Sequence, residues 1–396
     1  MILIIIAFLL GIIIGIITGL LPGIHTNLVS VFLLSISPFL LDYFSPFAIA
    51  TFIISLAISN LILEFLPAIF FGAPEESTVL GIMPGHYLLL NQKGHSAVSL
   101  AMSGAFLALL LSIILVPIFI FIIPKIYPFL QRMMGFILIL FSIFLIFRDK
   151  ERIIALTFFI ISGFLGIATL NLNVNQSLLP MLSGLFGSSA LIYSISQKTK
   201  IPEQKIEKIE INKKSLIKPA IATILVSPVC SFLPGLGNSQ AALLGSEIIK
   251  MSKEEFMIFL GSINMIVMSM SFFAVYIIQK SRTGAAAAVS QLISPTLLQV
   301  VYFFIIILLS LAISVFIAFN LSKFLAKNIN HFNYSKTSFI ILAIIIIAVI
   351  AFSGFLGLFI FIVSTLLGLA CLNYKTGMGH LLGCLLVPTI LFYLPF

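Results

Sequence analysis

Residues 21–27 (LPGIHTN) and residues 233–239 (LPGLGNS) begin with the same Leu-Pro-Gly motif, and each copy interrupts a long apolar stretch. Proline lacks a backbone N–H and clashes with the preceding helical turn, whereas glycine adopts dihedral angles that are closed to other residues. Each copy therefore predicts a broken helix, with polar side chains beside freed backbone groups. Helices broken at corresponding places in two halves of a chain are typical of the substrate site of a secondary transporter.

The composition around these motifs is that of a membrane protein. Of the 396 residues, 61% are hydrophobic and 8% are charged, whereas soluble domains contain about 25% charged residues. Stretches such as residues 2–20, 47–71 and 97–123 reach the length of about 20 apolar residues that crosses a bilayer. We expect an all-α polytopic protein of the cell membrane, with roughly ten to fourteen segments. The first stretch lacks a basic n-region and a small-residue cleavage site, so it is expected to stay as a helix.

One polar segment divides the chain. Residues 197–218 are rich in lysine, which predicts a cytoplasmic linker between an N-terminal membrane repeat (residues 1–196) and a C-terminal one (residues 219–396). The net charge of +9 comes from residues at segment ends, so a nucleic-acid partner is not expected. The three cysteines lie in apolar runs, without the spacing of a disulfide framework or a metal site.

The two halves resemble each other beyond the Leu-Pro-Gly motif. Residues 162–167 (SGFLGI) return as residues 353–358 (SGFLGL), in the same order relative to the motif. Roughly seven segments per half would make the repeats inverted, with an outside N-terminus and an inside linker. The cations Lys125, Arg132, Lys280 and Arg282 then fall on the outer side, against the positive-inside rule. Either the segment count is wrong or some of these residues have another role.

Polar residues at the two breaks and in the motif at residues 280–284 (KSRTG) are the candidate substrate ligands. Amides and hydroxyls suit a carboxylate or a sodium ion, a helix N-terminus favours an anion, and an arginine offers an anion seat. An arginine at a membrane interface can instead bind lipid phosphates, and a lone histidine often only bonds a carbonyl. The predicted substrate-binding residues are Pro22, Gly23, His25, Thr26, Asn27, Pro234, Gly235, Gly237, Asn238, Ser239, Gln240, Arg282 and Thr283.

A second set of residues is predicted to line the pathway or to couple ions: Glu64, Glu75, Glu76 and His86. Glu64 stands inside an apolar segment, where an ionisable group is functional by default, although it could merely pair with a buried cation. The other three lie in a polar interruption at residues 72–95, which reads either as a solvated loop or as a re-entrant loop. We favour the re-entrant loop because its flanking residues are too apolar for open solvent.

Enzymatic function is not expected. The chain has no phosphate-binding G-x-x-x-x-G-K-[ST] motif, so it cannot drive transport by hydrolysing ATP itself. Residues 187–190 (GSSA) are weakly similar to the serine motif of intramembrane proteases, with His380 as a conceivable base, but small residues in a membrane helix usually serve packing. We expect no catalytic residue, no resident metal and no cofactor, with sodium as a candidate coupling ion.

With these motifs in hand, the chain resembles the TctA family, the large permease subunit of tripartite tricarboxylate transporters, in a shorter archaeal-type form. The resemblance rests on residues 21–25, 72–76, 83–86, 93–94, 232–237, 280–286 and 364–368. It implies uptake of a di- or tricarboxylate with a sodium or proton gradient, assisted by a small membrane subunit and an extracytoplasmic binding protein. His25 stands where glycine is common in the family, and Glu75 and Glu76 replace small residues, which affects the substrate more than the fold.

Two functional hypotheses follow. The first is a secondary-active permease for a small organic anion, working in the lipid bilayer. The second is a translocase for polyprenyl phosphate or another lipid headgroup, since re-entrant loops and an arginine could also seat a phosphate.

Overall fold

Helices make up every regular element of the part of the chain that the structure describes. A computed structural model describes residues 2–21, 29–30, 33–34, 36–72, 78, 82–196, 201–206, 212–232, 237–281, 283–329, 334–374 and 376–394. The α-helices of the first half are α1 (Ile2–Leu20), α3 (Ser37–Leu40), α4 (Pro46–Leu63), α5 (Phe65–Phe71), α6 (Ile82–Leu90), α7 (Gly94–Arg148), α8 (Arg152–Asn171), α9 (Leu178–Leu182) and α10 (Ser189–Ser196), with the π-helix η2 (Ser183–Ser188). Those of the second half are α11 (Lys213–Phe232), α12 (Asn238–Ile248), α13 (Lys253–Ile277), α14 (Gly284–Leu292), α15 (Leu297–Asn328), α16 (Tyr334–Asn373) and α17 (Gly383–Tyr393), with the 3₁₀-helix η4 (Met378–Leu382).

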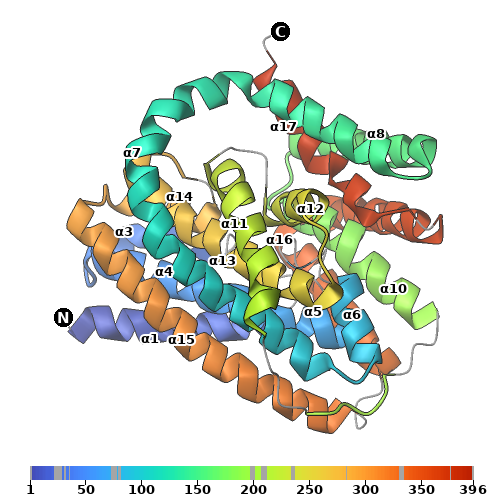
Figure 1. Cartoon of the computed structure of the whole chain (residues 1–396), viewed down its shortest axis with the longest axis horizontal. Helices are drawn as coiled ribbons and strands as arrows, with labels where there is room; N and C mark the ends of the chain where they lie inside the picture. The colour runs from blue at the N-terminus through green and yellow to red at the C-terminus, as the bar shows by residue number, and fades with distance from the viewer. Residues whose placement is uncertain are drawn as a thin grey trace.

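Eight of the described helices are long and apolar enough to cross a membrane. Helix α7 has 55 residues and contains three prolines, and Figure 1 shows it curving around one end of the molecule. Helix α16 has 40 residues and a non-helical kink at Gly354. At 1.5 Å per residue these two helices measure about 80 Å and about 60 Å, enough for two crossings each of a hydrocarbon core about 30 Å thick. The predicted all-α polytopic membrane protein is confirmed.

Helices α4 and α13 form the centre of the molecule. Among the long apolar segments, the one formed by α4 with α5 and the one formed by α13 are the most buried. Helices α1 and α15 pack against α4, and helices α11 and α7 pack against α13. The α7–α13 crossing depends on glycine: a Cβ on Gly104 would lie 1.9 Å from the backbone oxygen of Ile258, and one on Gly261 1.9 Å from that of Ala101. Small residues that let backbones approach are the usual means of helix association in a membrane.

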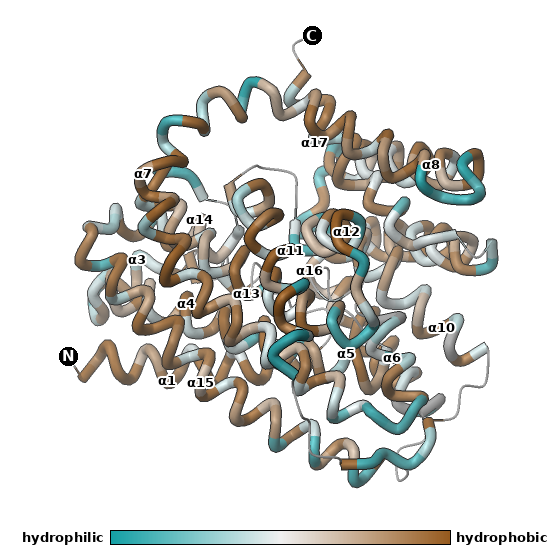
Figure 2. The backbone as a smooth tube through the Cα atoms, in the orientation of Figure 1, coloured by the Kyte–Doolittle hydropathy of each residue, from teal (hydrophilic) through white to brown (hydrophobic). Residues whose placement is uncertain are grey.

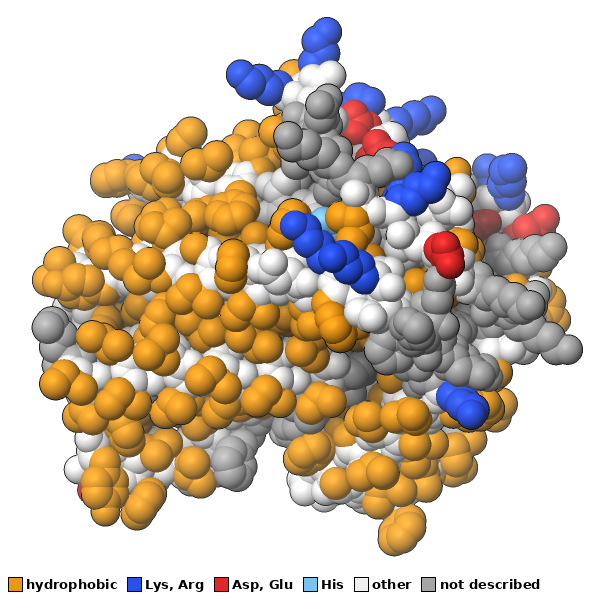
Figure 3. Space-filling view, turned by 90° about the horizontal axis from the view of Figure 1, so that it is seen from below, with side chains coloured by type: hydrophobic (Ala, Val, Ile, Leu, Met, Phe, Trp, Pro, Cys, Tyr) orange, Lys and Arg blue, Asp and Glu red, His pale blue; other side chains and the backbone are white. Residues whose placement is uncertain are grey.

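The outer helices present apolar side chains where a soluble protein would present charges. Phe121, Phe316 and Phe355 are 73%, 71% and 83% exposed, and the tube in Figure 2 is brown along most of the outer helices. In the face shown in Figure 3, hydrophobic side chains form a broad surface and the charged side chains gather toward one side. This distribution fits a bilayer around the helices, with charges at its edge.

The helix packing of one half has a counterpart in the other. The pair α1–α4 corresponds to α11–α13, α4–α15 corresponds to α13–α7, and α4–α14 corresponds to α13–α6. Likewise α8 packs on α17, and α16 packs on the segment formed by α9, η2 and α10. The pattern supports the predicted duplication; the two repeats, their inversion and their boundaries stay predictions.

The linker docks on the turn between α6 and α7. Gln204 Nε2 donates to the Leu89 carbonyl at 2.9 Å, and Gln204 Oε1 accepts from the Gly94 N–H at 2.8 Å. The Lys205 N–H also bonds the Gln92 carbonyl at 3.0 Å. Helix α11 begins at Lys213, so the last residues of the predicted linker are helical.

These contacts define one surface of the protein. Near the start of α13, Glu254 pairs with Lys93 at 3.6 Å and Glu255 pairs with Lys218 at 3.3 Å. We call the surface that carries Lys93, Gln204, Lys218 and Glu254 the linker surface. Helix α13 has 25 residues and rises about 37 Å, so Lys280, just beyond its C-terminus, lies at the opposite surface, which we call the far surface.

Candidate functional site

The helices that precede the two Leu-Pro-Gly motifs are α1 and α11. Helix α1 ends at Leu20, helix α11 ends at Phe232, and helix α12 starts at Asn238. The breaks themselves lie outside the described residues. The same is true of ten predicted site residues: Pro22, Gly23, His25, Thr26, Asn27, Glu75, Glu76, Pro234, Gly235 and Arg282.

The first turn of α12 contains three of the predicted site residues, Asn238, Ser239 and Gln240. Its N-cap is Gly237, which has no side chain to accept a hydrogen bond from the first turn. The first N–H groups of a helix have no intrahelical partner, and together with the helix dipole they favour an anion. Asn238 opens the helix, and Ser239 is fully buried beside it.

Gln240, in this same first turn, is fully buried. Neither its amide nitrogen nor its amide oxygen has a hydrogen-bond partner in the described structure. A buried polar group without a partner costs about 1–3 kcal/mol. An amide that can both donate and accept at the start of a helix is suited to a polar ligand.

Glu64 lies between two helical segments in the protein centre. It is 2% exposed and sits at the join of α4 and α5, where its N–H bonds the Asn60 carbonyl at 3.0 Å. Asn60 in turn donates from its side chain to Thr18 Oγ1 on α1 at 3.0 Å. Pro67, in the first turn of α5, lacks the N–H that would continue the hydrogen-bond ladder. Glu64 is thus buried inside the protein, and its role in ion coupling stays a prediction.

Thr283 caps helix α14. Its hydroxyl accepts from the Ala286 N–H at 3.2 Å and lies 3.0 Å from the Ser271 hydroxyl of α13. Behind the cap, Ala285, Ala286 and Ala288 are fully buried, and α14 packs against α4. The alanine run therefore serves close packing, and the Thr283 hydroxyl fixes the start of the helix.

His86 lies on α6, and its neighbour Gly85 faces Ile69 of α5 and Met257 of α13. His86 itself is half-buried. Helix α6 is thus held between α5 and the central helix α13. This packing fits a loop that folds back into the protein better than a solvated loop.

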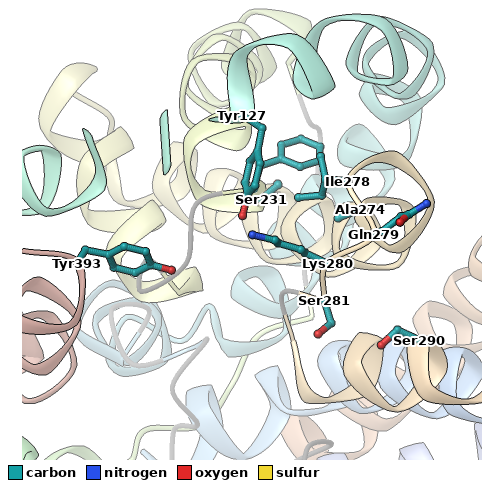
Figure 4. A pocket seen from close by; sticks show the side chains of 10 residues that line it. Tyr127, Ser231, Ala274, Ile278, Gln279, Lys280, Ser281, Ser290 and Tyr393 are labelled. Carbon is teal, nitrogen blue, oxygen red and sulfur yellow. The ribbon is translucent and has the colours of Figure 1, made fainter. Parts of the chain in front are cut away.

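A polar cavity of about 390 Å³ joins two of the predicted motifs. Ser231 and Phe232, just before the second break, line it together with Lys280 and Ser281, which precede Arg282. Figure 4 shows these residues around the cavity with Tyr127 of α7. Its volume falls within the range of about 300–1,000 Å³ that is typical of small-molecule sites. The structure therefore brings the end of α11 close to the first two residues of the KSRTG motif, about 50 residues away in the sequence.

The protease motif is accounted for by packing. The Ser188 hydroxyl donates to the Gly184 carbonyl at 3.1 Å and lies 2.5 Å from the Thr365 hydroxyl. His380 Nε2 instead lies 2.8 Å from Asp149 Oδ2. Ser188, the conceivable nucleophile, and His380, the conceivable base, therefore bond other residues and not each other.

Sequence reasoning missed a charge cluster where α7, α12 and η4 meet. Arg148 pairs with Glu247 near the end of α12, and Asp149 pairs with His380 of η4. Burial raises the pKa of Asp149, but hydrogen bonds from the Glu151 N–H and from His380 outweigh it, so this pKa lies below its ordinary value. These partners are 99 and 231 residues apart, so no local pattern could have paired them.

Comparison with known proteins decides the family. The sequence model of the tripartite tricarboxylate transporter TctA family matches residues 5–383. The chain belongs to the TctA family. TctA proteins are transporters rather than enzymes, so the long apolar helices belong to a multi-pass membrane permease.

A relative of this TctA protein is known from Methanocaldococcus jannaschii. That uncharacterized protein is 30% identical over 398 residues, which cover 98% of each chain. No solved structure matches the chain. The family therefore gives the class of transport but not the residues of the site.

Proposed function

We propose that this TctA protein is a secondary-active permease that takes up a small organic anion of the di- or tricarboxylate class. The family membership supports a tricarboxylate-type permease. The single observation that carries the anion site is Gln240, a fully buried amide without a partner in the described structure, in the first turn of α12. The positive end of the α12 dipole lies at this turn and supplies the preference for negative charge.

The driving force is a sodium or proton gradient. Glu64 supports this part of the proposal, because a buried carboxyl group at a join between helices can hold a cation or a proton. Amides and hydroxyls such as those of Asn238 and Ser239 are also suitable sodium ligands. As in the tripartite systems for which the family is named, a small membrane subunit and an extracytoplasmic binding protein would complete the transporter.

The test is thermal stabilisation of the purified protein by a panel of di- and tricarboxylates, in sodium and in potassium buffers. A ligand that binds only the folded state stabilises it by about 2.7 kcal/mol at one hundred times its dissociation constant. We expect at least one carboxylate to raise the melting temperature, more strongly in sodium if sodium is the coupling ion. A protein stabilised by none of them, with or without a binding protein present, would contradict the proposal.

One observation favours the second candidate, a lipid-headgroup translocase. An apolar groove of about 610 Å³ lies between α7, α13 and α15, lined by residues such as Pro117, Phe273 and Val300, and could hold an acyl chain. No charged residue is among those that line it in the described structure, so it offers no seat for a phosphate. Stabilisation by polyprenyl phosphate and not by carboxylates would favour the lipid-headgroup translocase over the carboxylate permease.

A further inference from the structure

Lys280 is the only charged residue among the described residues that line the polar cavity. Figure 4 shows its amine pointing toward Tyr127 and Ser231. The Tyr393 and Ser290 side chains, from α17 and α14, complete a wall rich in hydroxyl groups. The cavity therefore combines one cation with several neutral hydrogen-bond donors.

Among the described residues, no carboxylate pairs with Lys280. Its Nζ donates to Gln131 Oε1 at 3.1 Å and lies 5.1 Å from the centre of the Tyr127 ring. Both partners are neutral. The lysine and arginine ion pairs of the described structure use Lys93, Arg148 and Lys218 as cations. A cation held over a cavity by neutral groups is placed to attract an anion.

Two cations of α7, Lys125 and Arg132, differ from Lys280 in the direction that they face. Tyr127 is buried, whereas Lys125 and Arg132 are exposed. At 100° per residue they lie about 160° and about 140° around the helix from Tyr127, so they face away from the cavity. Their positions fit cations that reach lipid phosphates at the membrane edge. Of these three cations, Lys280 lines the polar cavity and the other two do not.

We propose that Lys280 is a substrate-binding residue that holds a carboxylate group of the anion in the cavity at the far surface. Because the linker surface is predicted to be cytoplasmic, this cavity is where an incoming anion first meets the permease. Hydroxyl groups of Ser231 and Ser281 supply further donors to the carboxylate oxygens. The inference rests on the proposed function and adds a cationic subsite to it.

The experiment is initial-rate uptake of labelled succinate and citrate by proteoliposomes, with wild-type protein and four variants. Loss of one charge-assisted contact of the substrate is expected to raise KM roughly 5- to 30-fold in Lys280→Gln, with little change in kcat. Lys280→Arg keeps the charge and should retain a KM close to that of the wild type. Lys125→Gln and Arg132→Gln remove a charge from the same surface and serve as matched controls with an unchanged KM. Added salt should raise the wild-type KM more than that of Lys280→Gln.

An unchanged KM in Lys280→Gln, or an equal increase in a control variant, would overturn the inference while leaving carboxylate transport in place. Absence of carboxylate uptake by the wild-type protein would instead overturn the proposed function, and this subsite with it. The melting temperature of each variant without substrate separates a folding defect from a binding defect. A Lys280→Gln protein that melts like the wild type but is no longer stabilised by citrate supports the subsite.

Discussion

Gln240 is a buried residue whose side chain is better explained by ligand binding than by stability of the fold. Its amide atoms have no hydrogen-bond partner in the described structure, and burial has removed their hydration. Such an amide lowers the stability of the ligand-free protein. Such a residue is explained if a ligand supplies the missing partners. Replacing such a residue should therefore affect stability and ligand binding with opposite signs.

We expect Gln240→Met to keep or raise the melting temperature of the ligand-free protein, because methionine has a similar length and needs no hydrogen bond. The same variant should lose stabilisation by carboxylates and lower uptake at least about tenfold. Gln291→Met, at an exposed position on α14, is the control and should change neither. A large loss of stability in ligand-free Gln240→Met would show that the amide is structural.

Asp149 allows a prediction about pH. Its pKa is lower in the folded protein than in the unfolded chain, so its contribution to stability is complete above the unfolded value of about 3.9. That contribution is lost as the pH falls through the lower, folded pKa. We expect Asp149→Asn to melt at a lower temperature than the wild type at neutral pH, and the difference to shrink below about pH 4. Asp42→Asn, at the other aspartate of the chain, is the control; a difference that persists unchanged at low pH would contradict the assignment.

At the scale of elements, the crossing of α7 and α13 fixes the centre of the protein. Each of Gly104 and Gly261 faces the backbone of the opposite helix with no room for a Cβ. We expect Gly104→Val or Gly261→Val to lower the free energy of unfolding by roughly 3 kcal/mol or more, measured as loss of monodisperse protein and of melting temperature. Gly377→Ala is the matched control, because the nearest atoms to a Cβ there are 3.9 Å away. Folding of the Gly261 variant at wild-type yield would contradict this packing.

The linker contact at Gln204 gives a second test at this scale. Gln204→Ala leaves the Gly94 N–H and the Leu89 carbonyl without their side-chain partner. Amide hydrogen exchange in the α6–α7 turn should become faster by roughly tenfold, the effect of losing about 1.4 kcal/mol of local stability. Lys205→Ala removes an exposed side chain but keeps the backbone bond to Gln92, so it should leave the exchange rates unchanged. Equal exchange in Gln204→Ala and the wild type would show that the linker does not hold this turn.

The elements could be predicted from the sequence to the extent that their signals are local. Proline and glycine mark the ends of α1 and α11, and apolar length marks the spans. The length of helix α7 is harder to predict from the sequence, because Pro117, Pro124 and Pro128 lie inside the helix and do not end it. In a membrane, neighbouring helices can satisfy the freed backbone groups and tolerate such prolines. Contacts such as Lys280 with Gln131 and Gln204 with Gly94 join residues 149 and 110 apart, so they depend on tertiary packing, for which one sequence holds no pattern.

For the whole molecule, we expect the linker surface and the far surface to face opposite sides of the membrane. Cysteines introduced at Lys205 on the linker and at Lys125 on the far surface should react with an impermeant maleimide from opposite sides of intact, oriented vesicles. Both native lysines are exposed, whereas the three native cysteines are buried and should give little background. Labelling of both positions from the same side would contradict the predicted topology and the assignment of the cavity to the outside.

The central claim is that this TctA protein moves a small carboxylate with an ion gradient. The most direct measurement is uptake of labelled citrate and succinate into proteoliposomes under an imposed sodium or proton gradient, with Gln240→Met as the site control. We expect the wild type to accumulate the anion until its internal concentration exceeds the external one. This accumulation should collapse when the gradient is dissipated, and it should be lost in the variant. Equilibration that ignores both gradients, or uptake undiminished in Gln240→Met, would contradict the central claim.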